Sequence, residues 1–189
     1  ATNPYAYLLQ TYFLNRRFAM IKEAMKNDNN ILDRSIYEDE IFMKMNTEMG
    51  NATKVEYDIY KSLLNIMMEE LPYAAHKKSP DLMITIKVSY ETMIKRIIKR
   101  GRDYEQIEKD PSLVDYYHRL LSHYDDWMDE YDESPLLIID GDKYDFVADV
   151  KDRVKILETI EDKLYDLGNL EQTKVDELRK AHLEILKQQ

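Results

Sequence analysis

A charged and hydroxylated triplet follows a short apolar run near the N-terminus. Asp33, Arg34 and Ser35 come directly after Ile31 and Leu32. An apolar run that ends in an acid, a base and a hydroxyl is typical of a buried strand that ends at a ligand site, because open α/β sheets bind ligands at the carboxyl ends of their strands. The alternative is that Asp33 or Ser35 only caps the next helix. The arginine between the two possible caps favours a site.

A second segment concentrates positive charge. Five of the eight residues at 95–102 are Lys or Arg, in a chain whose formal net charge is −10. Two like-charged pairs stand one helical turn apart, and each costs roughly 0.2–0.5 kcal/mol. A bound anion would relieve this repulsion, and arginine guanidinium groups suit phosphate oxygens. We expect Gly101 and residues 102–106 to form a loop that closes over a phosphate. The alternative is a solvated helix face.

The elements that must position these groups follow from apolar periodicity. Apolar runs at 30–32, 81–88 and 135–140 predict three buried strands. The segments between them read as crossover helices, which predicts a three-layer α/β fold with a mostly parallel sheet flanked by helices. The expected helices cover residues 5–26, 36–49, 53–71, 90–100, 111–131, 147–167 and 173–187.

The bulk composition limits the class of protein. A chain of 189 residues that is 44% hydrophobic and 34% charged is expected to be one soluble domain over residues 1–189. No apolar run is long enough to cross a bilayer, so we expect no membrane partner. The absence of cysteine excludes disulfides and fits a cytoplasmic protein. The negative charge argues against nucleic acid polymers as partners.

Three segments, taken together, resemble the deoxyribonucleoside kinase family. They are YLLQTYFL at 7–14, DRSIYED at 33–39 and KRIIKRGRDYEQ at 95–106, in that order. The likeness is strongest to the deoxyadenosine and deoxyguanosine kinases of Gram-positive bacteria, and it runs from Tyr5 to about Leu167. It implies a P-loop kinase fold and the ATP-dependent phosphorylation of the 5′-hydroxyl of a purine deoxynucleoside in nucleotide salvage.

The resemblance implies a substrate pocket made of five side chains. Gln10 matches the glutamine that hydrogen-bonds the base edge. Arg17 and Asp39 match the polar pair that completes base recognition, and Met43 is expected to line the same pocket. Glu105 matches the acid that contacts the sugar 3′-hydroxyl.

The resemblance also implies a catalytic and a nucleotide-binding set. Asp33 matches the acid near Mg²⁺, and Arg34 matches the arginine beside the catalytic base and the 5′-hydroxyl. A magnesium acid with an arginine clamp is what phosphoryl transfer requires. The expected ligands of the ATP phosphates are Arg96, Arg100 and Arg102, and the expected adenine contacts are Asp142, Asp145 and Phe146.

One part of the family pattern is absent from this sequence. The family begins with a strand and a G-x-x-x-x-G-K-[ST] loop that cradles the ATP phosphates. The four glycines here do not fit that loop, and the family's catalytic glutamate on the second strand is also missing. We therefore expect further residues before Ala1 that carry the loop and the general base. The alternative is a relative without a P-loop.

Two other functions stay open at this point. One is a nucleoside monophosphate kinase such as a thymidylate kinase, which shares the architecture and the arginine lid. The other is a non-catalytic nucleoside-binding subunit without the ATP cradle. Gln10 together with residues 33–35 favours the nucleoside kinase.

Methionine is more frequent in two of the expected helices than one core face needs. An apolar excess on a soluble chain is typical of an interface. The family resemblance implies a helix-bundle dimer, made either with an identical chain or with a close paralogue. The alternative is a methionine-rich core. The residues concerned are Met43, Met45, Met49, Met67 and Met68.

Overall fold

The computed structural model describes residues 3–74 and 79–187. The chain divides into two compact units: Ala1–Ser79 with Asp115–Glu130 form unit 1, and Pro80–Val114 with Tyr131–Gln189 form unit 2. That residues 1–189 form a single domain stays a prediction.

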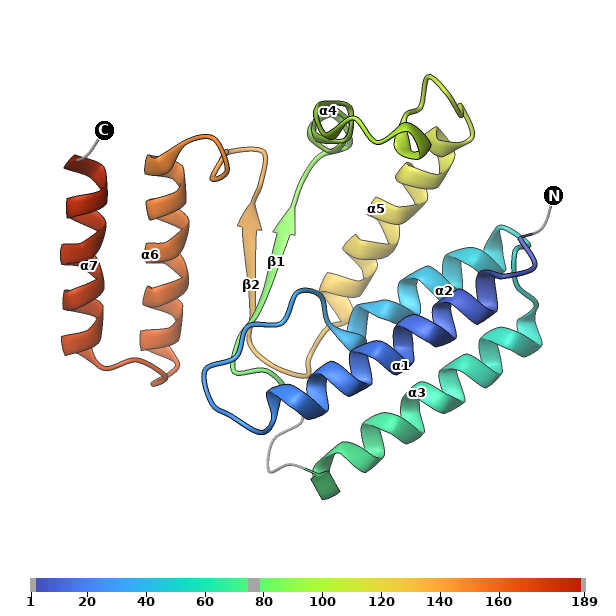
Figure 1. The fold of residues 1–189 in the computed structure, drawn as a ribbon, viewed down its shortest axis with the longest axis horizontal. Coiled ribbons are helices and arrows are strands. Elements are labelled where there is room, and N and C mark those ends of the chain that lie inside the picture. The colour runs from blue at the N-terminus through green and yellow to red at the C-terminus, as the bar shows by residue number, and fades with distance from the viewer. Residues whose placement is uncertain (1–2, 75–78, 188–189) are drawn as a thin grey trace. The chain divides into compact units, whose positions relative to one another are not determined.

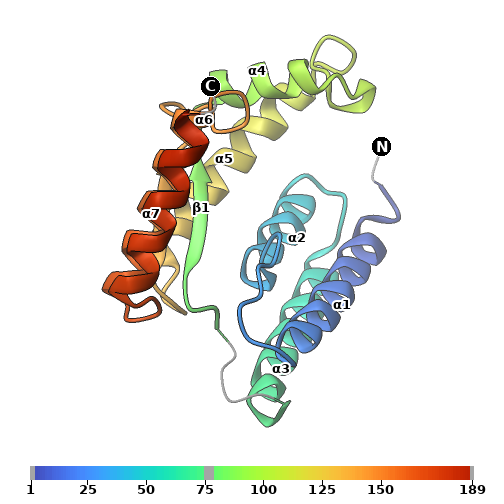
Figure 2. The same ribbon diagram turned by 60° about the vertical axis from the view of Figure 1, so that its left-hand side comes forward.

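Unit 1 is helical, with α1 and α3 packed together and α2 against both (Figures 1 and 2). A capping box begins α3, as the sequence predicts: the Thr53 N–H donates to Glu56 Oε2 at 2.7 Å, and the Glu56 N–H donates to Thr53 Oγ1 at 3.2 Å. The core includes Leu14, Ile36, Met43, Ala52, Tyr60 and Leu64. The elements are α1 (Ala6–Ala24), the 3-10 turn η1 (Ile36–Glu38), α2 (Asp39–Glu48), α3 (Lys54–Ala74) and α5 (Leu113–Glu130).

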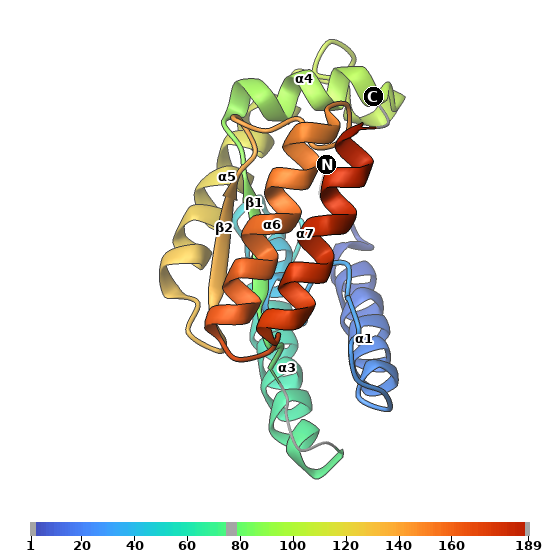
Figure 3. The ribbon, with the colours of Figure 1, turned by 90° about the vertical axis from the view of Figure 1, so that its left-hand side faces the viewer.

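Unit 2 contains the sheet. Strands β1 (Met83–Lys87) and β2 (Leu136–Asp140) are parallel, in a register that pairs Met83 with Leu136 and Lys87 with Asp140. Two of the three predicted strands and their parallel pairing are therefore confirmed. Figure 3 shows the last two helices side by side along this sheet. The helices of this unit are α4 (Tyr90–Arg100), the 3-10 turn η2 (Asp103–Glu105), α6 (Val150–Asp166) and α7 (Gln172–Lys187).

The strand predicted at 30–32 is wrong. These residues lie in an irregular segment, and the side chain of Ile31 is 97% exposed. A strand forms where a neighbouring strand satisfies its backbone donors and acceptors. In the part of the chain that the structure describes, the sheet has only β1 and β2. The segment therefore leads into η1 as a loop.

Four of the five methionines singled out from the sequence pack into or against the protein interior rather than line an exposed surface. Met43 and Met45 are buried, with exposed fractions of 0% and 1%. Met67 and Met68 are partly buried against the core of unit 1. Met49 alone of the five is largely exposed, at 41%. The sequence could not separate these cases, because apolar side chains serve a core and an interface equally well.

A close backbone approach joins the two strand ends in unit 2. The Gly141 N–H donates to the Lys87 carbonyl at 2.7 Å. A Cβ at Gly141 would lie 2.6 Å from Val88 Cγ1, which is too close for any other residue without a shift. Glycine therefore holds the segment after β2 against the end of β1.

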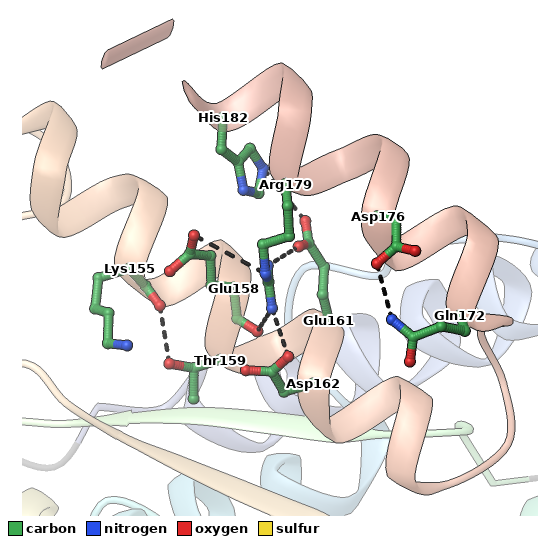
Figure 4. A network of polar contacts seen from close by, with 9 residues as sticks. All are labelled: Lys155, Glu158, Thr159, Glu161, Asp162, Gln172, Asp176, Arg179 and His182. Carbon is green, nitrogen blue, oxygen red and sulfur yellow. Dashed lines mark hydrogen bonds and ion pairs between the residues drawn. The ribbon is translucent and has the colours of Figure 1, made fainter. Parts of the chain in front are cut away.

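A charged network joins α7 to α6 (Figure 4). Arg179 forms ion pairs with Glu161 and Asp162 and donates to the Glu158 carbonyl at 3.1 Å. His182 Nε2 lies 3.3 Å from Glu161 Oε1. Glu161 and His182 are both buried, so this network fixes the helical hairpin from its inner side.

Candidate functional site

The predicted site residues divide between the two units. Unit 1 carries the base-recognition set and the triplet at 33–35. Unit 2 carries the three predicted phosphate-binding arginines, Glu105 and the segment at 142–146.

Arg17 and Asp39 form a buried ion pair in unit 1. Arg17 Nε lies 2.6 Å from Asp39 Oδ1, and the two side chains are 14% and 3% exposed. Burial raises the pKa of Asp39, and the hydrogen bond from Arg17 opposes this shift. Asp39 Oδ2 is also buried and finds no hydrogen-bond partner within the described residues. An unpaired buried acceptor is costly, so a ligand that donates a hydrogen bond fits this position.

Gln10 and Met43, the other two predicted base-pocket residues in unit 1, lie on the helix faces that carry Arg17 and Asp39. Gln10, Leu14 and Arg17 are spaced by one turn along α1, and Met43 follows Asp39 by one turn on α2. Gln10 is 9% exposed and Met43 is 0% exposed. Leu14 and Met43 belong to one core cluster. The structure thus brings three of the five predicted substrate residues, Arg17, Asp39 and Met43, to the contact between α1 and α2, and Gln10 lies buried on the same face of α1.

The triplet at 33–35 forms a tight turn. Ser35 is the N-cap of η1, and its Oγ accepts the Tyr37 N–H at 3.0 Å, so the capping alternative holds for this residue. Arg34 has φ of 67°, in the left-handed region. Its guanidinium lies 5.1 Å from the ring centroid of Phe42, within the range of a cation–π contact. The Asp33 side chain is exposed.

Glu38 is a buried acid near two of the predicted site residues, and the sequence reasoning did not include it. It is only 9% exposed, and the positive charges of Arg34 and Arg17 act on its carboxyl group. Burial raises its pKa, and the two arginines oppose the shift. The spacing from Ser35 to Glu38 is that of a capping box, which is the signal that could have found it.

As the pH rises above 4.5, the free energy of unfolding of Glu38→Gln is expected to increase relative to that of wild type. The folded protein holds the Glu38 proton more tightly than the unfolded chain, whose pKa is near 4.5. The stability that this group contributes is therefore present below that pH and lost as the pH rises through the raised pKa. Glutamine stays neutral throughout. Urea unfolding of both proteins between about pH 5 and pH 8 checks this, and a constant difference across the range would contradict it.

Two of the predicted phosphate-binding arginines share one carboxylate in unit 2. Arg100 Nη2 lies 2.7 Å from Glu105 Oε2, and Arg102 Nη1 lies 3.4 Å from Glu105 Oε1. The arginine side chains are 49% and 54% exposed, whereas that of Glu105 is 15% exposed. Glu105 therefore holds the two guanidinium groups together on the segment after α4.

The third arginine anchors the segment at 142–146. Arg96 Nη2 donates to the carbonyls of Gly141, at 2.7 Å, and Tyr144, at 3.4 Å. Asp142 accepts the Ser89 N–H at 3.0 Å, at the start of α4. These hydrogen bonds join α4, which carries Arg96, to the predicted adenine segment. The other two residues of that set also order the turn before α6: the Asp145 N–H donates to Asp152, and the Phe146 carbonyl accepts from Arg153.

The deoxynucleoside kinase family matches residues 1–165 of this sequence. The chain belongs to the deoxynucleoside kinase family. The predicted family and the predicted class of enzyme, a phosphotransferase, are confirmed. Helix α7 begins at Gln172, after the matched residues.

Several deoxynucleoside kinases are similar to this chain in sequence, and one is similar in structure. The deoxyguanosine kinase of Lactobacillus acidophilus is 56% identical over 88% of this chain and 72% of its own length. The deoxyadenosine kinase of the same species is 50% identical over 88% of this chain and 77% of its own length. The solved structure of deoxyadenosine kinase from M. mycoides with bound dATP has a TM-score of 0.64 and 29% identity, over 84% of this chain and 75% of that one. The predicted α/β fold of the P-loop kinase type is confirmed by this likeness.

The metal expected for a kinase of this family is Mg²⁺. Residues 3–74 and 79–187 contain no group of three or more metal-ligating side chains. Mg²⁺ in phosphate-transferring enzymes is bound through one or two carboxylates together with substrate phosphates. A single exposed carboxylate, such as that of Asp33, fits this mode of binding.

None of the helices in the described stretches is both long enough and apolar enough to cross a bilayer.

Proposed function

We propose that this deoxynucleoside kinase transfers the γ-phosphoryl group of ATP to the 5′-hydroxyl of a purine deoxynucleoside, deoxyadenosine or deoxyguanosine. The observation that carries the proposal is the buried Arg17–Asp39 pair, with an unpaired acceptor at Asp39 Oδ2. Arg17 lies on the same face of α1 as Gln10, which supports a pocket that recognises a base by hydrogen bonds. The similarity to kinases named for each of the two purine nucleosides supports the substrate class.

The chemistry of the side chains suits the edges of purines. A glutamine amide both donates and accepts, which matches the N6 and N7 atoms of adenine. An arginine guanidinium donates two hydrogen bonds, which matches the O6 and N7 atoms of guanine. The free oxygen of Asp39 suits an exocyclic amino group of either base. Met43 supplies an apolar wall.

The phosphate chemistry rests on positive charge. Phosphoryl transfer is mostly positioning and charge neutralisation. We assign Arg34 to the acceptor side, next to the 5′-hydroxyl, and Arg100 and Arg102 to the donor phosphates. Glu105, which holds these two arginines, also contacts the sugar 3′-hydroxyl in this proposal. Mg²⁺, when bound to the phosphates and Asp33, supplies further neutralisation of their charge.

Arg96 and the segment at 142–146 complete the donor side. The hydrogen bonds of Arg96 to two carbonyls of this segment support a shared role in holding ATP. The adenine contacts that we propose are Asp142, Asp145 and Phe146. The cysteine-free composition supports a cytoplasmic location.

Replacing Gln10 with alanine is expected to weaken binding of the deoxynucleoside by about 1–3 kcal/mol, because a base edge would remain buried without its partner. The measurement is a calorimetric titration of the full-length protein with deoxyadenosine and deoxyguanosine, beside a phosphorylation assay with ATP. Asn15→Ala, at an exposed amide on the same helix, is the control and should leave affinity unchanged.

The same assay tests the function itself. Transfer of phosphate to thymidylate but not to deoxynucleosides would replace the proposal by a nucleoside monophosphate kinase. Nucleoside binding without transfer would indicate a non-catalytic subunit. An unchanged affinity in Gln10→Ala would remove this residue from the pocket.

We further propose that unit 1 pairs with a second chain through α1 and α3. These helices pack together, and both expose large apolar side chains. On α3 they border a shallow groove that includes Ser62 and Leu63. The exposed residues are Leu8, Leu9, Tyr12 and Phe13 on α1 and Val55, Ile59 and Ile66 on α3.

Replacing Ile59 with aspartate is expected to convert a dimer into monomers, because a charge would be buried in the apolar contact. Light scattering at micromolar concentration measures the mass of both proteins. Leu183→Asp, at a side chain that is 56% exposed on α7, is the control and should stay dimeric. A monomeric wild-type protein would reject the interface.

A further inference from the structure

A glycine separates two of the predicted phosphate-binding arginines in unit 2. Gly101 has φ of 71°, in the left-handed region that glycine adopts readily, and its N–H donates to the Ile97 carbonyl at 3.1 Å. Arg100 is the last residue of α4 before this turn, and Arg102 follows the turn. The helix therefore fixes the backbone of Arg100, whereas the backbone of Arg102 needs a support of its own.

The side-chain amide of Gln106 supplies this support. Its Nε2 donates to the Ile97 carbonyl at 3.2 Å and to the Arg102 carbonyl at 3.0 Å. A glutamine amide has two N–H donors, so it can bind two carbonyls at once. Ile97 is buried, at 7% exposed, so one end of this bridge is attached to a part of α4 that packing holds in place. The other end holds the backbone of Arg102 itself.

The backbone around Gln106 closes the same segment. The Glu105 N–H donates to the Arg102 carbonyl at 3.0 Å. The Gln106 carbonyl accepts the N–H groups of Lys109, at 3.0 Å, and Asp110, at 3.1 Å. Gln106 is thus attached on both sides, through its side chain to α4 and Arg102 and through its carbonyl to the turn that follows.

The ion pairs of Glu105 hold the guanidinium groups but not the backbone of Arg102. The side chains of Arg100 and Arg102 are 49% and 54% exposed, and ion pairs at exposed positions are weak. A bound phosphate would also compete with Glu105 for these groups. The hydrogen bonds of Gln106 act on backbone carbonyls, so they persist when the guanidinium groups turn to a phosphate.

We propose that Gln106 is a positioning residue for Arg102: by joining the Ile97 and Arg102 carbonyls, it holds the backbone from which the guanidinium reaches the donor phosphates. This inference rests on the proposed function, in which Arg102 binds these phosphates. Gln106 lies outside the set of site residues that the family resemblance implies. All three residues belong to unit 2.

The test is a double-mutant cycle in the full-length protein, with ATP and deoxyadenosine or deoxyguanosine. Gln106→Met keeps the length of the side chain and removes both donors. It is expected to lower kcat about 10- to 100-fold, because a small misplacement of a group at the reacting centre has an effect of that size. The KM of either substrate should rise by a smaller factor than kcat falls. In an Arg102→Ala background, Gln106→Met should change kcat by no more than about twofold, because it acts through Arg102.

A second readout is independent of activity. The Glu105 N–H is bonded to the same Arg102 carbonyl that accepts from Gln106. Loss of the bridge should loosen this turn, so the Glu105 amide should exchange its hydrogen faster in Gln106→Met than in wild type. Hydrogen exchange of the two proteins, measured without substrates, provides this comparison.

Gln172→Met is the matched control. Gln172 also belongs to unit 2, and its Nε2 donates to Asp176 Oδ1 at 2.9 Å on α7. The same substitution there removes a side-chain hydrogen bond far along the chain from the arginines. It should leave kcat within about twofold of wild type.

Three kinetic outcomes would overturn the inference. Gln106→Met could keep the wild-type kcat, its effect could persist fully in the Arg102→Ala background, or KM could rise by as much as kcat falls. Unchanged exchange at the Glu105 amide would overturn it as well, whatever the activity. A wild-type protein that phosphorylates no deoxynucleoside would instead overturn the proposed function.

Discussion

Replacing Arg100 with alanine is expected to lower turnover by about 10²–10³-fold, which corresponds to about 2.7–4 kcal/mol of transition-state stabilisation. The guanidinium would neutralise charge that develops on the transferred phosphoryl group, so its loss should affect kcat more than nucleoside affinity. In the structure Arg100 is held by Glu105 and is half exposed, where a phosphate can reach it. Steady-state kinetics of the full-length protein provide the measurement.

Lys99→Ala is the control for this experiment. Lys99 is the adjacent exposed base on α4, and it lies outside the predicted phosphate set. Its loss should change stability by less than about 0.5 kcal/mol and leave turnover nearly unchanged. If Arg100→Ala behaves in the same way, the basic face of α4 is solvated surface and the donor site lies elsewhere.

Replacing Arg179 with alanine is expected to lower the free energy of unfolding by about 3 kcal/mol, because Glu161 would stay buried after losing its main cationic partner. Glu161 is 8% exposed, and His182 is its only other partner in the network of Figure 4. Urea unfolding followed by circular dichroism measures the change. Nucleoside affinity should stay the same at temperatures where the protein is folded.

Lys174→Ala provides the comparison on the same helix. Lys174 pairs with Glu177 at 3.1 Å, and both side chains are more than half exposed. Exposed pairs of this kind contribute about 0.2–1 kcal/mol at most. Equal effects of the two substitutions would mean that the Arg179 network is as weak as a surface pair.

Local sequence signals were sufficient for most of the helices and for two strands. The spacing of apolar residues predicted α4 at the bounds that the structure shows, and the Thr53–Glu56 pair predicted the start of α3. Helices and caps depend on residues within one or two turns, so periodicity and capping chemistry contain the necessary information. The parallel pairing of β1 and β2 followed from the helical crossover between them.

The spacing of residues along the helices also limited which of the predicted site residues could lie together. Gln10 and Arg17 lie on one face of any helix that contains both, and Asp39 and Met43 lie on one face of another. The sequence could therefore propose the pocket, once the family resemblance had supplied the roles. It could not show that Arg17 and Asp39 are buried together, or that one oxygen of Asp39 is left without a partner.

Tertiary packing alone decided the remaining features. Residues 30–32 have the composition of a buried strand, but a strand needs a paired neighbour, and Ile31 is 97% exposed. Met43 lies in the core and Met49 on the surface, although their side chains are identical. Glu38 looks like an ordinary acid in a helix cap until its burial is known. Burial and pairing depend on residues distant in the chain, and no local pattern records them.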